Sequence, residues 1–229
     1  NKLFPHISES CLVIGATATP IRTGNQSSMQ EFYTDIIQQV DTPDLIGLGN
    51  LSACHSFGVK MDLSNIKKTA GEYDPKQVGQ MYQERKVYEG VISNYKRLCP
   101  NSKSLIFASS IDSAIELKEQ MLDAGIPSAV IHSKQKAETN QNIIKVFQDA
   151  EPDRAITLIN VGILTAGFDC PDIQSIILYR ATTSLALFLQ MVGRGSRTTE
   201  TKDSFTLLDF GNNINEHDSC ELAGLRHRF

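Results

Sequence analysis

Short apolar runs alternate with amphipathic stretches over the second half of the chain, and this alternation restricts the possible folds more than any other feature. Five apolar runs have the length of buried strands, at residues 104–108, 128–132, 155–159, 175–179 and 205–208. Segments with helical spacing lie between them at 111–124, 135–148 and 184–192. This order is typical of a mainly parallel sheet covered by helices, so we predict an α/β domain.

The part of the chain before Pro75 has a different pattern. A buried-strand run is predicted at residues 11–16, a helix at 28–40 and an extended segment at 54–63. Residues 64–74 are rich in Ser, Asn, Lys, Gly and Asp, as linkers are. A helix follows at 75–98, where Tyr82, Val91 and Tyr95 are near helical spacing. We predict that residues 1–63 are the end of a preceding domain plus a connector, 64–74 a linker and 75–229 the compact domain.

Composition limits the classes of partner. The formal net charge is -4 and the pI is about 5.7, so any binding of nucleic acid must use a local site rather than the charge of the whole surface. No apolar run approaches the roughly 20 residues that span a bilayer, and the N-terminus lacks a signal-peptide pattern. We predict a cytoplasmic protein without a membrane partner.

Cysteine and histidine spacing predicts no metal site. The five cysteines form no C-x-x-C pair, which disfavours a zinc ribbon and a disulfide framework and favours reduced, buried thiols. The histidines at 6, 55, 217 and 227 have no metal-ligand spacing and are interpreted as surface or tail residues.

The strongest motif is Gln190-Met-Val-Gly193-Arg194-Gly-Ser-Arg197, at the end of an apolar helix. Arg194 and Arg197 can project from one helix end, while the glycines let the backbone approach a ligand. Planar guanidinium groups suit the charge that develops on phosphate oxygens during phosphoryl transfer, so the pair could act as arginine fingers. The alternative is a glycine-rich helix C-cap with solvated arginines.

A second motif runs from Asn160 to Pro171 and follows the strand predicted at 155–159. Its Gly, Thr and Asp residues are expected at the carboxyl edge of the sheet, where open α/β folds bind ligands. Asp169 could meet a ribose hydroxyl or pair with one of the arginines, and Thr165 could meet a nucleic-acid phosphate. The alternative is a tight turn in which Gly167 supplies a positive φ and Asp169 caps.

A third motif, Gly15-Ala-Thr17-Ala-Thr19-Pro20, places two hydroxyl residues at the end of a predicted strand. The hydroxyls of Thr17 and Thr19 could relay hydrogen bonds to a neighbouring domain. The alternative is an ordinary threonine cap.

In this order and at these separations, the three motifs resemble motifs III, V and VI of superfamily 2 helicases. Residues 104–110 resemble motif IV, and Ile131-His132-Ser133 resembles the short element that follows it. The Gly-Arg-Gly-x-Arg form and the trailing residues 207–213 are nearer to DEAH and bacterial repair-type enzymes, including the RadD-like group. Residues 42–51 resemble the interdomain connector of that group.

The resemblance implies a RecA-like three-layer sandwich that forms the C-terminal motor half of an ATP-dependent helicase or translocase. It implies that Arg194 and Arg197 contact the γ-phosphate, with Gln190 in support. The other roles that it implies are nucleotide contact for Gly167, Asp169 and Gly193, nucleic-acid contact for Ser109, His132 and Thr165, and interdomain coupling for Thr17 and Thr19. Its partners would be nucleic acid, with DNA favoured over RNA, and the N-terminal RecA-like domain of the same protein.

The sequence departs from a complete motor in two respects. It has no G-x-x-x-x-G-K-[ST] loop and no acidic box before Thr17, so ATP and Mg²⁺ would be bound by the full-length protein, and this chain alone is expected not to hydrolyse ATP. Two alternatives stay open: a translocase subunit of a restriction-type system that pulls duplex DNA, and a nucleic-acid-binding module that has lost hydrolysis.

Overall fold

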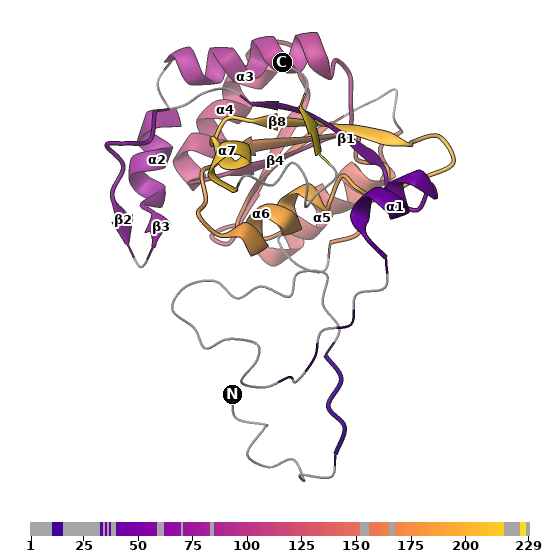
Figure 1. Cartoon of the computed structure of the whole chain (residues 1–229). Helices are drawn as coiled ribbons and strands as arrows, with labels where there is room; N and C mark the ends of the chain where they lie inside the picture. The colour runs from indigo at the N-terminus through magenta and orange to yellow at the C-terminus, as the bar shows by residue number, and fades with distance from the viewer. Residues whose placement is uncertain are drawn as a thin grey trace.

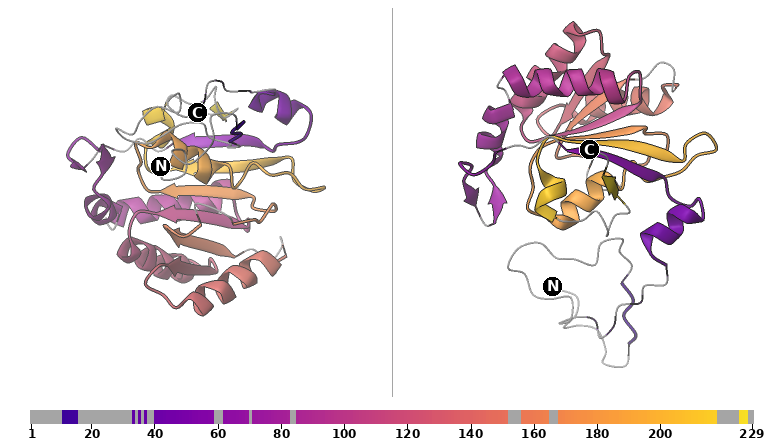
Figure 2. Two further views of the ribbon diagram at one scale, coloured as in Figure 1. Left: turned by 90° about the horizontal axis from the view of Figure 1, so that it is seen from below. Right: turned by 45° about the horizontal axis from the view of Figure 1, so that its top comes forward.

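The central feature of the computed structural model is one seven-stranded sheet with the strand order β5-β6-β4-β7-β8-β1-β9, in which every registered pair is parallel. The structure describes residues 11–15, 33, 35, 37, 40–58, 62–69, 71–82, 85–151, 156–164, 168–217 and 225–227. Figure 2 shows the strands side by side, with β1 next to β8. The prediction of a mainly parallel sheet is confirmed.

The five strands predicted between residues 104 and 208 are all present. They are β4 (Ser104–Ala108), β5 (Ser128–His132), β6 (Thr157–Val161), β7 (Ser175–Tyr179) and β8 (Ser204–Asp209). Three of them have the predicted bounds, and β6 lies two residues later than predicted. β4 and β7 are buried along their whole length, as expected for central strands that are covered on both faces.

Helices cover both faces of the sheet, which gives three layers (Figure 1). One face carries α2 (Pro75–Tyr82), α3 (Arg85–Leu98) and α4 (Ile111–Asp123), and the other carries α5 (Ala137–Asp149), α6 (Leu185–Val192) and α7 (Asn213–His217). Alternate side chains of β4 enter the two cores: Leu105 and Phe107 join the core of α5 and α6, and Ile106 joins the core of α2 to α4. The three-layer α/β prediction is confirmed.

The sheet begins earlier in the chain than the predicted domain start at residue 75. Strand β1 (Ala53–Gly58) pairs with β8 over six residues and with β9 (Leu225–His227) on its other side. Cys54 and Ser56 are buried, and their alternation with less buried neighbours is that of a strand near the edge of a sheet. Residues 53–58 therefore belong to the compact domain rather than to a preceding one.

Three short elements before Pro75 were not predicted. Helix α1 (Thr42–Gly47) lies within the segment interpreted as a connector, and strands β2 (Lys68–Thr69) and β3 (Glu72–Tyr73) form a hairpin within the predicted linker. The hairpin packs on the sheet domain, because Glu72 accepts hydrogen bonds from the backbone N–H of Thr183 at 2.9 Å and the hydroxyl of Thr182 at 2.8 Å.

The strand predicted at residues 11–16 is wrong for the residues that the structure describes. Residues 11–15 form no strand, and Leu12 and Ile14 are 86% and 82% exposed. Most of the helix predicted at 28–40 lies outside the described residues.

Candidate functional site

The two motif arginines lie on a loop that follows α6, here named the arginine loop (residues 193–197). The Ser184 hydroxyl begins α6 by accepting a hydrogen bond from the backbone N–H of Leu187 at 3.2 Å. The helix ends at Gly193, whose N–H donates to the Leu189 carbonyl at 2.8 Å. A Cβ atom on Gly195 would overlap the ring of Phe205, so this position accepts only glycine without a shift of the neighbouring strand.

Arg194 and Arg197 converge on the same short segment. Arg194 is 8% exposed and donates from Nη1 to the Phe168 carbonyl. Arg197 donates from Nη1 to the same carbonyl at 3.3 Å and forms an ion pair with Asp169 Oδ1 at 2.8 Å. Asp169 therefore pairs with one of the motif arginines, as one of the two sequence-based interpretations expected.

The two arginines differ in how freely they can exchange partners. Burial lowers the pKa of Arg194, the nearby charge of Arg197 lowers it further, and Asp169 opposes the shift. The side chains of Arg197 and Asp169 are 36% and 72% exposed. An ion pair this open is worth only about 0 to 1 kcal/mol, so Arg197 can leave Asp169 for a stronger anion.

The arginine loop lies at the amino edge of the sheet, opposite to the edge predicted for Asp169. α6 follows the carboxyl end of β7 and returns along the sheet, so its end reaches the level at which β8 begins. Lys103, directly before β4, contacts Asp172 at 2.6 Å, which places the 168–172 segment at this edge too. The prediction of the carboxyl edge holds for Asn160 and is wrong for Asp169, because the chain crosses the sheet between them.

Two residues that the sequence analysis did not select hold the arginine loop in place. Lys202 Nζ donates to the carbonyls of Gly195 and Arg197, each at 2.7 Å. Ser52 donates from Oγ to the same Arg197 carbonyl at 2.8 Å. No sequence signal identifies either of them, since their contacts are formed only in the fold.

Polar side chains also lie at the carboxyl ends of β4, β6 and β5, which are neighbouring strands. Ser109 Oγ, His132 Nδ1 and Asn160 Nδ2 are buried and have no hydrogen-bond partner. Asn160 Oδ1, in contrast, accepts hydrogen bonds from the backbone N–H groups of Ile163 and Leu164, each at 3.0 Å. Ser109 follows β4 and His132 ends β5, and both strands neighbour β6, which carries Asn160. Ser109 and His132, but not Asn160, were predicted from the sequence as nucleic-acid contacts.

The remaining predicted residues have simpler positions. Gln190 is exposed on the last turn of α6, and Gly193 caps that helix. Thr17, Thr19, Thr165 and Gly167 lie outside the described residues.

The described residues suit the phosphate groups of ATP, one of the ligands that the resemblance implies. A half-exposed guanidinium beside a buried one suits phosphate oxygens. Within the described ranges, no group of three His, Cys, Asp or Glu side chains is placed to bind a metal ion. The same part contains no helix that could cross a membrane.

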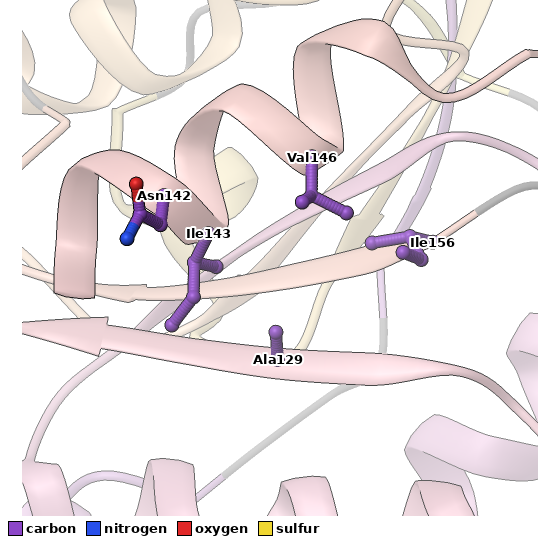
Figure 3. Close-up of a pocket in the computed structure, with 5 residues that line it drawn as sticks. All are labelled: Ala129, Asn142, Ile143, Val146 and Ile156. Atoms are coloured by element: carbon purple, nitrogen blue, oxygen red, sulfur yellow. The ribbon is translucent and has the colours of Figure 1, made fainter.

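Figure 3 shows an apolar pocket beside α5. It has a volume of about 190 Å³ and lies between α5 and the edge of the sheet. Its lining residues are Ala129, Asn142, Ile143, Val146 and Ile156, which include none of the predicted site residues.

Comparisons with known proteins identify the family of the chain. Residues 90–199 match the helicase conserved C-terminal domain. The IRC3 protein of Saccharomyces cerevisiae, named as an ATP-dependent helicase, is 32% identical over 176 residues, which are 75% of this chain and 25% of IRC3. The chain thus spans a quarter of this relative.

Two solved structures share the fold. A fragment assigned to the HsdR subunit of a type I restriction enzyme from Vibrio vulnificus is 18% identical, with a TM-score of 0.60 over 78% of this chain and 36% of that one. The ATP-dependent Type ISP restriction-modification enzyme LlaBIII, bound to DNA, is 17% identical, with a TM-score of 0.58 over 85% of this chain and 15% of that one. The sequence matches, the parallel sheet and the motif order together show that this chain carries the C-terminal RecA-like domain of a superfamily 2 helicase.

Proposed function

We propose that the full-length protein hydrolyses ATP and uses the energy to move along nucleic acid, and that this chain supplies the half of the ATP site that carries Arg194 and Arg197. The observation that carries the proposal is the half-exposed guanidinium of Arg197, which is held by an exposed carboxylate beside the buried guanidinium of Arg194. Two adjacent cations repel each other, and an incoming phosphate relieves that repulsion.

The two arginines have different parts in this proposal. Arg194 is fixed by the Phe168 carbonyl and supplies a preorganised positive charge. Arg197 exchanges Asp169 for the γ-phosphate when the neighbouring motor domain closes on ATP. Mg²⁺ and the phosphate-binding loop are supplied by that neighbouring domain.

Nucleic acid binds at the carboxyl edge of the sheet in this proposal. A buried polar atom without a partner costs about 1 to 3 kcal/mol, and Ser109, His132 and Asn160 each have one. A serine hydroxyl, an imidazole N–H and an amide NH₂ all donate well to phosphate oxygens. Asn160 lies at this edge and Asp169 pairs with Arg197, so one motif can link nucleic-acid binding to the ATP site.

The experiment that tests the proposal is nucleic-acid-stimulated ATPase activity of the full-length protein. We expect Arg197→Ala to lower kcat by roughly 10³-fold or more, because an arginine finger acts mainly in the transition state. Arg97→Ala removes an exposed arginine on α3 and should leave kcat unchanged. Unchanged turnover in Arg197→Ala, with ATP and nucleic acid still bound, would show that Arg197 is not an arginine finger. The absence of stimulated turnover in the wild type would leave a hydrolysis-independent binding module as the better explanation.

A duplex DNA translocase is the second candidate. The fold similarity to the HsdR fragment and to DNA-bound LlaBIII supports it, as does the predicted relation to bacterial repair-type enzymes. A translocase would displace a triplex-forming strand from duplex DNA in an ATP-dependent manner without separating the duplex. Strand separation in the same assay would favour a helicase instead.

A further inference from the structure

Lys202 is a buried lysine whose ammonium group is surrounded by backbone carbonyls. The residue is 8% exposed, and Nζ lies 2.7 Å from the carbonyl oxygens of Gly195 and Arg197 and 2.9 Å from that of Pro171. An ammonium group has three N–H donors, so three carbonyls use its full donor capacity. These carbonyls come from the arginine loop and from the segment that carries Asp169.

The backbone around Lys202 keeps its side chain in this position. Lys202 and Thr199 exchange two backbone hydrogen bonds, each at 3.2 Å, which close the turn between the arginine loop and β8. The Lys202 ammonium also lies 5.8 Å from the centre of the Phe205 ring. The backbone of Lys202 is therefore held just before β8, and its side chain extends to the arginine loop.

Ser52 holds the arginine loop by an independent set of contacts. Its backbone N–H donates to the Ser196 carbonyl at 2.7 Å, and its hydroxyl donates to the Arg197 carbonyl at 2.8 Å. Ser52 is 2% exposed and directly precedes β1. The Arg197 carbonyl thus accepts one hydrogen bond from Ser52 and one from Lys202.

A buried cation is costly, so apolar packing alone does not explain a lysine here. The ionisable groups that act on the ammonium are Asp172 and Cys170, which favour its charged form, and Arg197, which disfavours it. Burial outweighs them and lowers the pKa of Lys202 to about 8.

We propose that Lys202 is a positioning residue for the ATPase reaction, whose ammonium group fixes the arginine loop to the Phe168–Pro171 segment and so keeps Arg194 and Arg197 oriented toward one ligand. This inference rests on the proposed function. Loss of the proton removes the charge that draws the three carbonyls together. The loop then loosens, and turnover falls as the pH rises through about 8.

The test uses full-length protein and measures kcat and KM for ATP, with saturating nucleic acid, from well below to well above pH 8. We expect Lys202→Met to lower kcat by up to about 10²-fold, the scale of a 1 Å misplacement of a reacting group, with a smaller change in KM. The alkaline fall of kcat in the wild type should be absent from Lys202→Met. Lys202→Arg keeps the charge at all these pH values and should restore part of kcat without the alkaline fall.

The controls separate a positioning role from a structural one. Lys145→Met removes an exposed lysine of α5 and should keep the wild-type kcat and pH profile. In the Arg197→Ala background, Lys202→Met should lower kcat by less than in the wild type, because the part of its effect that acts through Arg197 is already lost. A Lys202→Met protein that melts at a lower temperature but keeps the wild-type kcat and alkaline fall would overturn the inference.

Three further outcomes are informative. If Lys202→Met does not fold, the test uses the pH dependence of kcat in the wild type and the kcat of Ser52→Ala. A wild-type kcat that does not fall above pH 8, together with an unchanged kcat in Ser52→Ala, would also overturn the inference. If Arg197→Ala itself keeps full turnover, the proposed function fails. A large loss in Arg197→Ala without any effect of Lys202→Met rejects only the role of Lys202.

Discussion

Arg197 Nη1 lies 2.8 Å from Asp169 Oδ1, and this ion pair joins the two motifs that contribute to the candidate ATP site. The pair is open to solvent, whereas the neighbouring Arg194 is 8% exposed and donates to the Phe168 carbonyl. The same residue type therefore occupies two environments within four positions of the chain. Because Arg194 is buried and Arg197 is half-exposed, Arg194 should contribute more to stability than Arg197 does.

The first prediction compares Arg194→Ala with Arg197→Ala in urea unfolding of this chain. Arg197→Ala should change the free energy of unfolding by less than about 1 kcal/mol, because the exposed pair is weak. Arg194→Ala should lower it by about 1 to 3 kcal/mol, because the Phe168 carbonyl loses a buried donor. Equal losses in the two variants would mean that the environments of the two arginines are not different.

The second prediction concerns Gly195, where an added Cβ atom would overlap the ring of Phe205. Gly195→Ala should destabilise the chain by about 1 to 3 kcal/mol, as overpacking does. Gly47→Ala is the matched control, since a Cβ atom there meets nothing within 4 Å, and it should change stability by no more than about 0.5 kcal/mol.

The cause can be checked by adding Phe205→Leu to Gly195→Ala, since the smaller side chain makes room for the methyl group. Thermal unfolding should show a smaller loss in the double variant than the sum of the two single losses. Simple additivity would mean that the clash with Phe205 is not the cause.

Much of the sheet could be predicted because its strands are short, mainly apolar runs. The central strands at 104–108 and 175–179 and the edge strand at 128–132 have the predicted bounds for this reason. β1 was assigned to an extended segment outside the compact domain, since His55 and Ser56 interrupt its apolar pattern and its partner β8 lies about 150 residues away in sequence. Local periodicity contains no information about such a pairing.

The site was predictable in the identity of its residues and less so in their placement. Arg194, Arg197 and Asp169 were selected from their motifs, and the structure brings them together. Their edge of the sheet was not predictable, because the described residues between β6 and β7 form no helix that would mark where the chain crosses. Lys202 and Ser52 were missed because they bind backbone carbonyls, which every residue has.

The third prediction follows from the lowered pKa of Lys202, about 8 in the fold against 10.5 as the ordinary value. Between these two pH values the unfolded chain binds more protons than the folded one, so the free energy of unfolding rises with pH. Below about pH 8 both states are protonated and this contribution to the slope vanishes. Lys202→Met should flatten the rise, and Lys145→Met should not. Urea unfolding at a series of pH values measures it, and a fall in stability across this window in the wild type alone would contradict the assignment.

The fourth prediction concerns Ser109, whose buried Oγ has no hydrogen-bond partner. Ser109→Ala removes an unsatisfied polar atom, so the free energy of unfolding should stay the same or rise slightly. Affinity of the full-length protein for nucleic acid should fall by about 1 kcal/mol, or roughly fivefold, if the hydroxyl donates to a phosphate. Fluorescence anisotropy with labelled duplex DNA, single-stranded DNA and RNA measures the loss of affinity for each type of nucleic acid.

The salt dependence of the same binding curves distinguishes a direct contact from an indirect one. A neutral hydroxyl releases no counterion, so Ser109→Ala should shift the affinity at every salt concentration without changing the slope. Ser93→Ala removes an exposed hydroxyl that bonds the Gly90 carbonyl at 3.1 Å and should leave affinity unchanged. If Ser109→Ala stabilises the fold but binds every nucleic acid as the wild type does, the carboxyl edge around Ser109 is not the nucleic-acid site. If affinity falls most for duplex DNA, the loss supports the duplex translocase over an RNA helicase.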